Sequence, residues 1–373
     1  MRPLDGITVV SLEHAVAGPF CTRQLADYGA RVIKIERPGT GDFARAYDDV
    51  AAGQSSYFVW LNRGKESVVL DLATASGKAS LEALLAQADV LLQNLRLGAL
   101  ARLGFGLDRL RSDYPRLITC SISGYGESGP FAERKAYDLL IQAESGLSSI
   151  TGGPEAPARV GVSVVDIATG ATAYSAVLEA LIGRAATGLG VDIHVAMFDV
   201  MADWMAVPLL HQEAGKPPRR MGLAHPSIAP YGVFSTRDGR DILIAVQSDR
   251  EWARLCAEFL RDPSAATDPR FATNVARVAN RAETDARVAR VFSTLDHAEA
   301  LARLEAADTA FAFVNDMAAL SAHPHLRRIE VETPNGPVAL PAPAPIVSGQ
   351  PRSYGPVPAL GGNADLEDGE TGE

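Results

Sequence analysis

The start of the chain alternates between apolar strands and a helix. The apolar run Ile7–Leu12 predicts a buried strand, and Arg31–Ile35 (RVIKI) predicts a second one. Between them Gly18–Tyr28 has helical character, with Pro19 early, where a first turn tolerates proline, and Gly29 at the end. Two strands joined through a helix form a β-α-β unit, which favours a parallel sheet. We therefore expect an α/β fold.

The alternation continues along the first third of the chain. Further apolar runs and one amphipathic segment predict strands at Ser67–Leu70, Val90–Leu92 and Leu117–Ser121 and a helix at Gly77–Gln87. The turn after the first strand, EHAVAG, lacks the Gly-x-Gly-x-x-Gly pattern of a dinucleotide site. Gly124, Gly126 and Gly129 satisfy that pattern, but Pro130 follows them instead of a helix. We interpret this segment as a glycine loop that shapes a pocket.

Composition bounds the class of protein. The chain has 373 residues, of which 47% are hydrophobic and 21% are charged, as in an ordinary globular protein. This length allows two domains with separate cores. The formal net charge is -10 and no basic run is present, so we expect no nucleic-acid partner. An anionic ligand stays possible, because it needs only a few local Arg or Lys side chains.

The cysteines and the apolar segments suggest neither a metal site nor a membrane anchor. Cys21, Cys120 and Cys256 lie far apart and form no CxxC pair, so we predict no disulfide framework and no metal. The first residues, MRPLDGITVV, lack the features of a signal peptide. We find no stretch of about 18 apolar residues that would cross a bilayer. We therefore expect a soluble cytoplasmic protein without a membrane partner.

The stretch Val160–Arg184 joins two kinds of pattern. Its β-branched start, Val160–Val165, predicts a strand, and the Ala- and Leu-rich remainder predicts a helix. Asp166 stands at the joint, where the helix dipole should keep its carboxylate ionised. It is either a helix N-cap or a nucleophile at the carboxyl end of a strand. Gly170, one turn later, would allow another backbone or a ligand to approach closely.

The second half of the chain predicts a smaller domain. The expected elements are a helix at Val191–Leu210, a hairpin at Gly232–Val246, helices at Asp249–Leu260 and Arg281–Ala307, and late strands at Val331–Leu340. The sequence Gly215–Ser227 is rich in Pro, Gly and basic residues, as linkers are. We predict a large domain at 1–210, a linker at 211–225, a small domain at 226–322, a return to the large domain at 323–360 and a disordered acidic tail at 361–373.

Several motifs occur in a characteristic order. They read GPFCTRQLADYGARVIKIERPGTGDFAR, LNRGKESVVLDL, ADVLLQN followed by GALARLGFG, SISGYGESGP, AYDLLIQAESG and APYGVFSTRDG. In this order the chain, from Pro3 to about Trp252, resembles the family III CoA-transferases. That family includes formyl-CoA, carnitine and mesaconyl-CoA transferases and the α-methylacyl-CoA racemases. The resemblance implies a Rossmann-like large domain built from both chain ends, a smaller α+β domain and an interlocked homodimer.

The resemblance also implies a chemistry for Asp166. The family's nucleophile matches this position, so its carboxylate would attack an acyl-CoA thioester to give a mixed anhydride and then an aspartyl-CoA thioester. A carboxylic acid acceptor would take the CoA, and no cofactor would stay bound. Oxyanion donors could come from backbone near Gly170 or from a loop of the partner chain. Short dicarboxylic or branched acyl groups, as in the mesaconyl type, would need a cation such as Arg159 near Asp166.

The positions that bind CoA in the family can be carried over one by one. Arg and Lys at such positions suit the phosphates of CoA through charge-assisted hydrogen bonds. The matching residues are His14, Ala15, Val16, Ala17, Arg37, Leu70, Ala73, Asn94, Leu95, Arg96, Arg102, Lys135, Ala136, Tyr137 and Asp138.

Some residues depart from the family pattern. The racemase motif Gly-His-Asp reads Ala136-Tyr137-Asp138 here, and tyrosine is a poor base at neutral pH, which favours transfer over racemisation. A CoA-binding protein without turnover is a further alternative. Val16 occupies the gating glutamine position of formyl-CoA transferase, and Gly222–Ser248 holds no glycine-rich gating loop, which argues against oxalate or formate specificity. The usual C-terminal helix is replaced by NADLEDGETGE.

Overall fold

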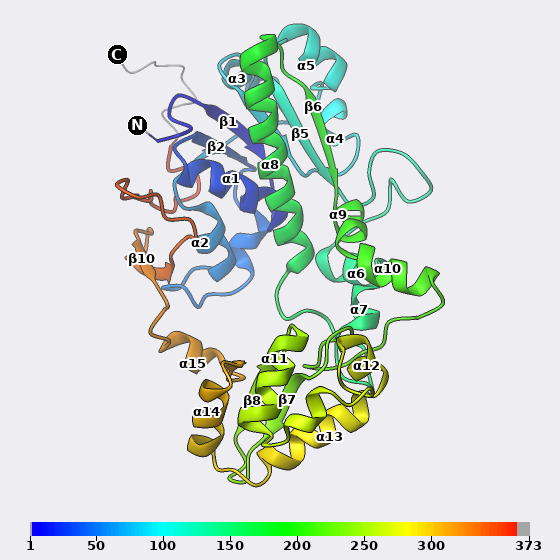
Figure 1. The fold of residues 1–373 in the computed structure, drawn as a ribbon. Helices are drawn as coiled ribbons and strands as arrows, with labels where there is room; N and C mark the ends of the chain where they lie inside the picture. Colours follow the sequence, from blue (N-terminus) through cyan, green and yellow to red (C-terminus); the bar gives the residue numbers. More distant parts are fainter. Residues whose placement is uncertain (1, 364–373) are drawn as a thin grey trace. The chain divides into compact units, whose positions relative to one another are not determined.

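The computed structural model describes residues 2–363, which form two compact units. Of the described residues, one unit comprises 2–148, Arg159–Leu209 and 327–363. The other comprises Ser149–Ala158 and Leu210–Leu326. The first unit is thus assembled from both ends of the chain (Figure 1). The finer domain limits stay a prediction, and residues 364–373 of the predicted disordered tail lie outside the described residues.

A parallel sheet organises the first unit. Its strands are β1 (Thr8–Leu12), β2 (Arg31–Glu36), β3 (Lys65–Val69), β4 (Val90–Gln93), β5 (Ile118–Ser123) and β6 (Asp192–Ala196). The described part of this sheet has six strands in the order β3-β2-β1-β4-β5-β6, and every pair is parallel. The predicted α/β class is therefore confirmed. The strand order reverses between β1 and β4, which is where sheets of this kind bind ligands.

Helices cover the two faces of the sheet (Figure 1). Those of the first unit are α1 (Ala17–Asp27), α2 (Ser56–Asn62), α3 (Ala75–Leu85), α4 (Ala99–Arg102), α5 (Leu107–Asp113), α6 (Asp138–Glu144), α7 (Leu147–Ile150), α8 (Val164–Thr187), α9 (Met197–Trp204) and α10 (Ala206–Glu213), whose last residues belong to the second unit. Helix α1 ends just before Gly29, whose φ of +113° is a conformation that favours glycine.

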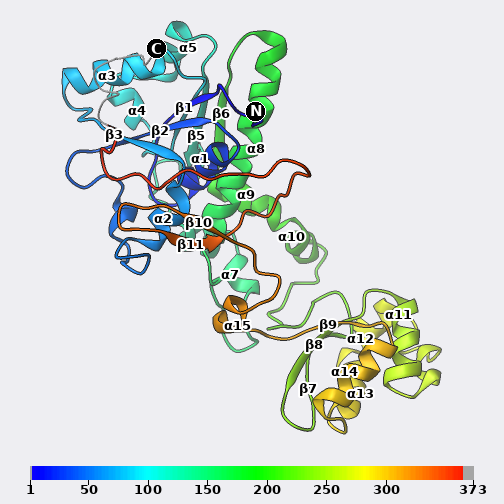
Figure 2. The ribbon, with the colours of Figure 1, turned by 90° about the vertical axis from the view of Figure 1, so that its left-hand side faces the viewer.

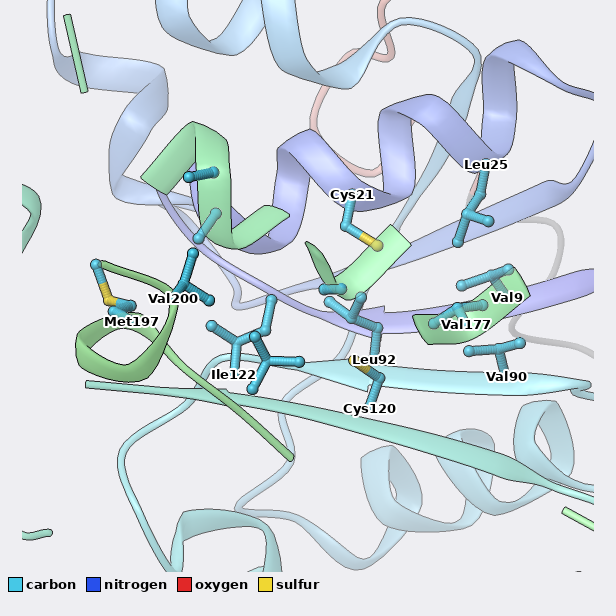
Figure 3. Close-up of a cluster of buried hydrophobic side chains, with 14 of the residues drawn as sticks. Val9, Cys21, Leu25, Val90, Leu92, Cys120, Ile122, Val177, Met197 and Val200 are labelled. Carbon is cyan, nitrogen blue, oxygen red and sulfur yellow. The ribbon is translucent and has the colours of Figure 1, made fainter. Parts of the chain in front are cut away.

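The largest core cluster lies between the sheet and helices α1 and α8. Val9, Val90 and Cys120 point from the strands toward Cys21 of α1 and Val177 of α8, and all five are buried (Figure 3). The two helices approach so closely that a Cβ added at the fully helical Gly170 would lie 2.5 Å from the carbonyl oxygen of Ala17. Gly170 is therefore required by helix packing, as one of the two roles expected for it.

The predicted strand at Val160–Val165 is wrong. Gly161 and Val162 form a bend, and α8 already begins at Val164. The backbone N–H of Val160 donates to Gln142 Oε1 at 2.9 Å, and that of Val165 donates to Asp138 Oδ1 at 2.8 Å. Because side chains of α6 accept these hydrogen bonds, the β-branched residues need no strand partner, and tertiary contacts override their β-propensity.

The predicted helix at Val191–Leu210 is wrong in its first part. Asp192–Ala196 forms β6, which pairs with β5 in the register Ile122↔Val195, and α9 begins only at Met197. The free edge of β5 supplies backbone partners that an isolated apolar pattern does not reveal. The remaining predicted strands and helices of the first unit are found within a few residues of their expected limits.

The second unit has an antiparallel sheet with helices packed on it. It consists of β7 (Tyr231–Ser235), β8 (Asp241–Ala245), β9 (Ala310–Ala312), α11 (Asp249–Arg254), α12 (Asn274–Ala279), α13 (Arg281–Phe292), α14 (His297–Ala306) and α15 (Met317–Ser321), together with a π-helical turn at Leu255–Phe259 and a 3-10 turn at Pro263–Ala266 (Figure 2). The predicted hairpin is confirmed as β7 and β8. The expected single helix at Arg281–Ala307 is two helices, because Asp296 starts α14 with a capping box that includes Glu299.

The chain returns to the first unit through the hairpin of β10 (Arg328–Val331) and β11 (Val338–Pro341). Late strands were predicted at Val331–Leu340, so β11 is found as expected, while β10 begins at Arg328, before the predicted range. This segment lies beside α2 (Figure 2), and Val331 and Val357 pack with Phe58 and Val59 in a small core of their own. Backbone contact is equally close farther along, since the N–H of Gly64 donates to Pro356 O at 2.7 Å. The return segment therefore completes the fold of the first unit.

One helix in the described part of the chain, α8, is long and apolar enough to cross a membrane by length and composition. The expectation that no segment crosses a bilayer stays a prediction, because this test uses length and composition alone and Asp166, Glu179 and Arg184 interrupt the apolar residues of α8. A core helix of a soluble protein meets the same criterion, and α8 contributes Val165, Ala173 and Val177 to the main core. One face of α8 packs against α1 and the sheet, whereas Ile182 of the same helix is 74% exposed.

Candidate active site

A cavity of about 700 Å³ lies in the first unit, at the carboxyl ends of β1, β4 and β5. His14 follows β1, Asn94 follows β4, and Ser123 ends β5, so the cavity is located at the point where the strand order reverses. The size falls within the range of ordinary small-molecule sites. This is the position at which a sheet of this topology presents its loops to a ligand.

Most of the residues carried over from the family resemblance gather around this cavity. The predicted residues that line it are His14, Ala15, Val16, Ala17, Asn94, Leu95, Arg96, Lys135, Ala136, Tyr137, Asp138 and Asp166. The other four do not line it. Arg37 follows β2 and donates to Gly41 O at 3.1 Å, Leu70 is buried after β3, Ala73 is exposed nearby, and Arg102 ends α4. Their predicted contacts with CoA stay a prediction.

The turn that follows β1 forms one side of the cavity. Asn94, which follows β4, makes two hydrogen bonds to the backbone of this turn. His14 N donates to Asn94 Oδ1 at 2.8 Å, and Asn94 Nδ2 donates to His14 O at 2.9 Å. Ala15 has a φ of +61°, a left-handed conformation that costs energy for any residue with a Cβ. The N–H of Ala15 donates to Asp42 Oδ1 at 3.1 Å. The turn is thus held from two sides.

Asp166 is the third residue of α8 and lines the cavity. Burial raises the pKa of its carboxyl to about 7, and the nearby charge of Asp138 adds to the rise. We expected the helix dipole to keep this group ionised, but removal from water outweighs the dipole here. A carboxyl with this pKa is half ionised near neutral pH, which is the range in which acids, bases and nucleophiles of active sites operate.

Asp138, the first residue of α6, takes the capping role that we considered for Asp166. Its Oδ1 accepts from Val165 N at 2.8 Å and from Asp166 N at 3.3 Å, and its Oδ2 accepts from Gln142 Nε2 at 2.7 Å. Ser163, at the N-cap position of α8, makes no side-chain capping bond. A carboxylate from another helix therefore satisfies the first N–H groups of α8 and leaves the carboxyl of Asp166 free of this task.

An aromatic wall that the sequence reasoning missed lines another side of the cavity. It consists of Phe43, Tyr47 and Tyr57. Phe43 stacks on His14 with ring centroids 5.4 Å apart, and Tyr47 meets Tyr57 edge-on at 5.5 Å. Burial raises the pKa of Tyr47 to about 12, with the charges of Asp42 and Asp166 contributing. The motif GTGDFAR pointed to this loop, but its spacing does not reveal which aromatic rings face a ligand.

Four cationic side chains line the cavity, and one of them is neutralised within the protein. Arg134 donates to Glu144 Oε1 at 2.9 Å. Arg159 donates from Nε to Val160 O at 3.0 Å, and Arg96 and Lys135 are the other two. Positive charge in the lining of a cavity that also holds aromatic side chains suits an anionic ligand. Among the described residues, no cluster of His, Cys, Asp or Glu is arranged to hold a metal ion.

Comparisons with known proteins match this chain to CoA-transferases. Residues 4–364 match the profile of CoA-transferase family III. A succinate–glutarate CoA-transferase of Agrobacterium fabrum is 37% identical over 96% of this chain and 93% of its own length. An acetyl-CoA:oxalate CoA-transferase of Acetobacter aceti is 42% identical over 74% of this chain and 72% of its own length.

A solved structure has the same fold. The crystal structure of a CAIB/BAIF family protein from Brucella suis superposes with a TM-score of 0.81 at 37% sequence identity. The match covers 98% of this chain and 98% of that one, so it includes both compact units.

Proposed function

This chain belongs to the family III CoA-transferases, and from that premise we propose that it transfers CoA through a covalent intermediate on Asp166. The observation that supports the proposal best is the placement of this carboxyl. It lines the cavity at the switch point of the sheet, its pKa is raised to about 7, and another aspartate performs the capping that would otherwise occupy it.

The proposed reaction proceeds by exchange at acyl carbons. The Asp166 carboxylate attacks the thioester carbonyl, a C–O bond forms, and the C–S bond breaks to give a mixed anhydride and CoA thiolate. The thiolate then attacks the aspartyl carbonyl, so that the donor acid leaves as a carboxylate and aspartyl-CoA thioester remains. The acceptor carboxylate attacks this thioester, and the released thiolate attacks the acceptor acyl carbon. Asp166 is regenerated and no oxidant or metal is needed.

The raised pKa of Asp166 fits this role. A carboxylate with a pKa near 7 is more basic than an ordinary one, and removal from water makes it more nucleophilic. At neutral pH about half of the molecules hold it in the ionised form that attacks. The partly buried position also limits access of water, which would hydrolyse the anhydride.

We propose that the first turn of α1 donates hydrogen bonds to the oxyanion of each tetrahedral intermediate. Val16 and Ala17 line the cavity, and no side chain caps this helix. The first N–H groups of a helix have no partners within it and lie at its positive end. Gly170, which we considered for this role from sequence, packs against Ala17 O and does not line the cavity.

We infer that the acyl groups are short and dicarboxylic. The relatives named above act, by their names, between succinate and glutarate or with oxalate. Arg159 lines the same cavity as Asp166 and is paired there with no carboxylate that the described contacts show. A guanidinium in this place would hold the distal carboxylate of the acyl group. The interlocked homodimer and the cytoplasmic location remain predictions.

Intact-mass spectrometry tests the covalent intermediate. Wild type incubated with succinyl-CoA, acetyl-CoA or oxalyl-CoA should gain the mass of an acyl group or of CoA, and hydroxylamine should remove it. Asp166→Asn should gain nothing, while Glu179→Gln should behave as wild type, because Glu179 is an exposed carboxylate on the same helix. An adduct that persists in Asp166→Asn refutes the assignment. Exchange of an α-proton without any adduct would instead support the racemase alternative.

A substitution at Arg159 tests the substrate class. Arg159→Gln should lower kcat/KM for succinyl-CoA by about 10- to 100-fold and leave kcat/KM for acetyl-CoA unchanged, because only the dicarboxylic acyl group loses a charged partner. Arg134→Gln is the matched control, since Arg134 lines the cavity but is already paired with Glu144. Equal losses for both donors would rule out recognition of the distal carboxylate by Arg159.

A further inference from the structure

Four charged side chains are buried directly behind the turn that follows β1. This buried charge cluster consists of Glu13, Lys34, Asp42 and Lys65, and the side chains of all four are fully shielded from solvent. Lys34 Nζ lies 2.8 Å from Asp42 Oδ2 and 3.6 Å from Glu13 Oε1, and Lys65 Nζ lies 2.7 Å from Glu13 Oε1. Two positive and two negative groups balance one another.

Stability alone does not account for the buried charge cluster, because removing four charged groups from water costs free energy. Replacement of buried ion pairs by apolar side chains of similar volume is often neutral or stabilising, so their presence calls for another function. None of the four side chains lines the cavity, and the transfer reaction proposed above uses none of them. Both lysines also bind backbone carbonyls of the turn or of the helix that follows it. Lys34 Nζ donates to Glu13 O at 3.2 Å, and Lys65 Nζ donates to Pro19 O at 3.2 Å.

Asp42 makes the decisive contact with the turn. One of its oxygens, Oδ1, accepts from Ala15 N at 3.1 Å and from Ala44 N at 2.9 Å, and lies 3.8 Å from His14 Nδ1. The other oxygen is held by Lys34. Ala15 adopts the left-handed conformation at φ +61°, which an alanine does not favour without a fixed partner. The carboxylate of Asp42 is that partner.

The left-handed turn at Ala15 sets the position of the first residues of α1. Ala15 is followed by Val16, the N-cap, and by Ala17, the first residue of the helix, and all three line the cavity together with Asp166. Phe43, which directly follows Asp42, stacks on the ring of His14. A shift of the left-handed turn would therefore displace the backbone N–H groups and one aromatic face of the cavity at the same time.

We propose that Asp42 is a positioning residue for CoA transfer, which the buried charge cluster fixes in place and which holds the left-handed Ala15 turn in the geometry that the reaction requires. Its action on the rate rests on the transfer function proposed above. Its action on the turn does not, because the hydrogen bond to Ala15 N exists without substrate. A displacement of about 1 Å at a reacting centre can lower the rate by about 100-fold.

The test compares Asp42→Ala with Asp27→Ala. Asp27 is also a buried aspartate of the first unit paired with a cation, since Arg63 donates to it at 2.9 and 2.6 Å, but it does not line the cavity or touch the turn. Both variants should lose thermal stability. Only Asp42→Ala should lower kcat for transfer from succinyl-CoA to glutarate, by about 10- to 100-fold per folded molecule. The dissociation constant for free CoA should change far less than kcat.

Two further measurements separate positioning from a loss of stability. Amide hydrogen exchange of the peptide that contains Ala15 should accelerate in Asp42→Ala and not in Asp27→Ala, whether or not any substrate is turned over. Ala15→Gly in the Asp42→Ala background should restore part of kcat, because glycine adopts a positive φ without help. Equal exchange of this peptide in the two variants, or equal kcat losses, would overturn the proposal. No recovery by Ala15→Gly would overturn it as well.

If wild type turns over but forms no covalent adduct, the Asp166 assignment fails and the Asp42 comparison still decides this inference. If wild type forms the adduct and Asp42→Ala forms it at the same rate, only the inference about Asp42 fails. The two proposals can therefore be refuted separately.

Discussion

The raised pKa of Asp166 predicts that the protein gains stability when this carboxyl is replaced by a neutral amide. Asp166→Asn keeps the size of the side chain and removes the ionisation. The folded chain shifts the pKa from an ordinary value of 3.8 to about 7, chiefly through burial. Between these two values the folded state holds a proton that the unfolded chain has released. Stability of wild type therefore falls as pH rises through this window and is level above it.

The size of the effect follows from the shift. A displacement from 3.8 to about 7 corresponds to about 4 kcal/mol of cost for the ionised form in the folded state. At pH 8 the whole cost is present, so Asp166→Asn should be more stable than wild type by about 4 kcal/mol. At pH 5 most folded molecules already carry the proton, and the advantage should shrink to about 2 kcal/mol. Active sites commonly contain groups that lower the stability of the fold but are needed for activity.

Urea unfolding of wild type and Asp166→Asn, followed by circular dichroism from pH 5 to pH 8, measures this difference. Glu179→Gln provides the control for loss of one exposed negative charge from α8, and its stability should follow wild type at every pH. The reasoning is refuted if Asp166→Asn gains nothing at pH 8, or if its advantage over wild type does not grow between pH 5 and pH 8.

Three further predictions concern activity and packing. The pH profile of kcat/KM should have an acid limb near pH 7 that reports Asp166, and Asp138→Asn should move this limb to lower pH because one charge that raises the pKa is removed. In α8, Gly170→Ala should cost several kcal/mol in urea unfolding, since its Cβ would meet a backbone oxygen of α1 at 2.5 Å, whereas Gly183→Ala, with open space around it, should be neutral or stabilising by about 1 kcal/mol. Asp296→Ala should lower the stability of the second unit by about 1 kcal/mol through loss of the capping box and leave kcat unchanged.

The parts of the fold that sequence predicted are those in which local signals agree with tertiary partners. In the first β-α-β unit the apolar runs, Pro19 and Gly29 all indicate the same limits, and the structure has strands at Thr8–Leu12 and Arg31–Glu36. The strand predicted at Val160–Val165 is wrong because it was inferred from β-branched residues alone. In the structure the side chains of Asp138 and Gln142, on another helix, accept the backbone hydrogen bonds of this segment. Such long-range acceptors leave no local pattern.

The sequence also predicted part of the candidate site. His14 and Asn94 meet at one cavity because both follow parallel strands and so lie at the same edge of the sheet. Asp166 reaches this cavity from the first turn of α8, not from the end of the strand that the sequence suggested. The aromatic wall was not foreseen, since Phe43 begins a short 3-10 helix and Tyr57 lies in α2, and the approach of these two elements depends on tertiary packing. The pKa of Asp166 was predicted with the wrong sign, because burial of a side chain cannot be read from its position in a helix.

The way in which the first unit closes has a consequence for its biosynthesis. Phe58 and Val59 are exposed as soon as they leave the ribosome, but their packing partners Val331 and Val357 are translated much later. At ordinary rates of translation this interval lasts on the order of tens of seconds. During that time the nascent chain presents an apolar surface on α2 to chaperones and proteases. Translation of the segment that holds Val331 and Val357, not synthesis of the sheet, is then the event that completes this small core.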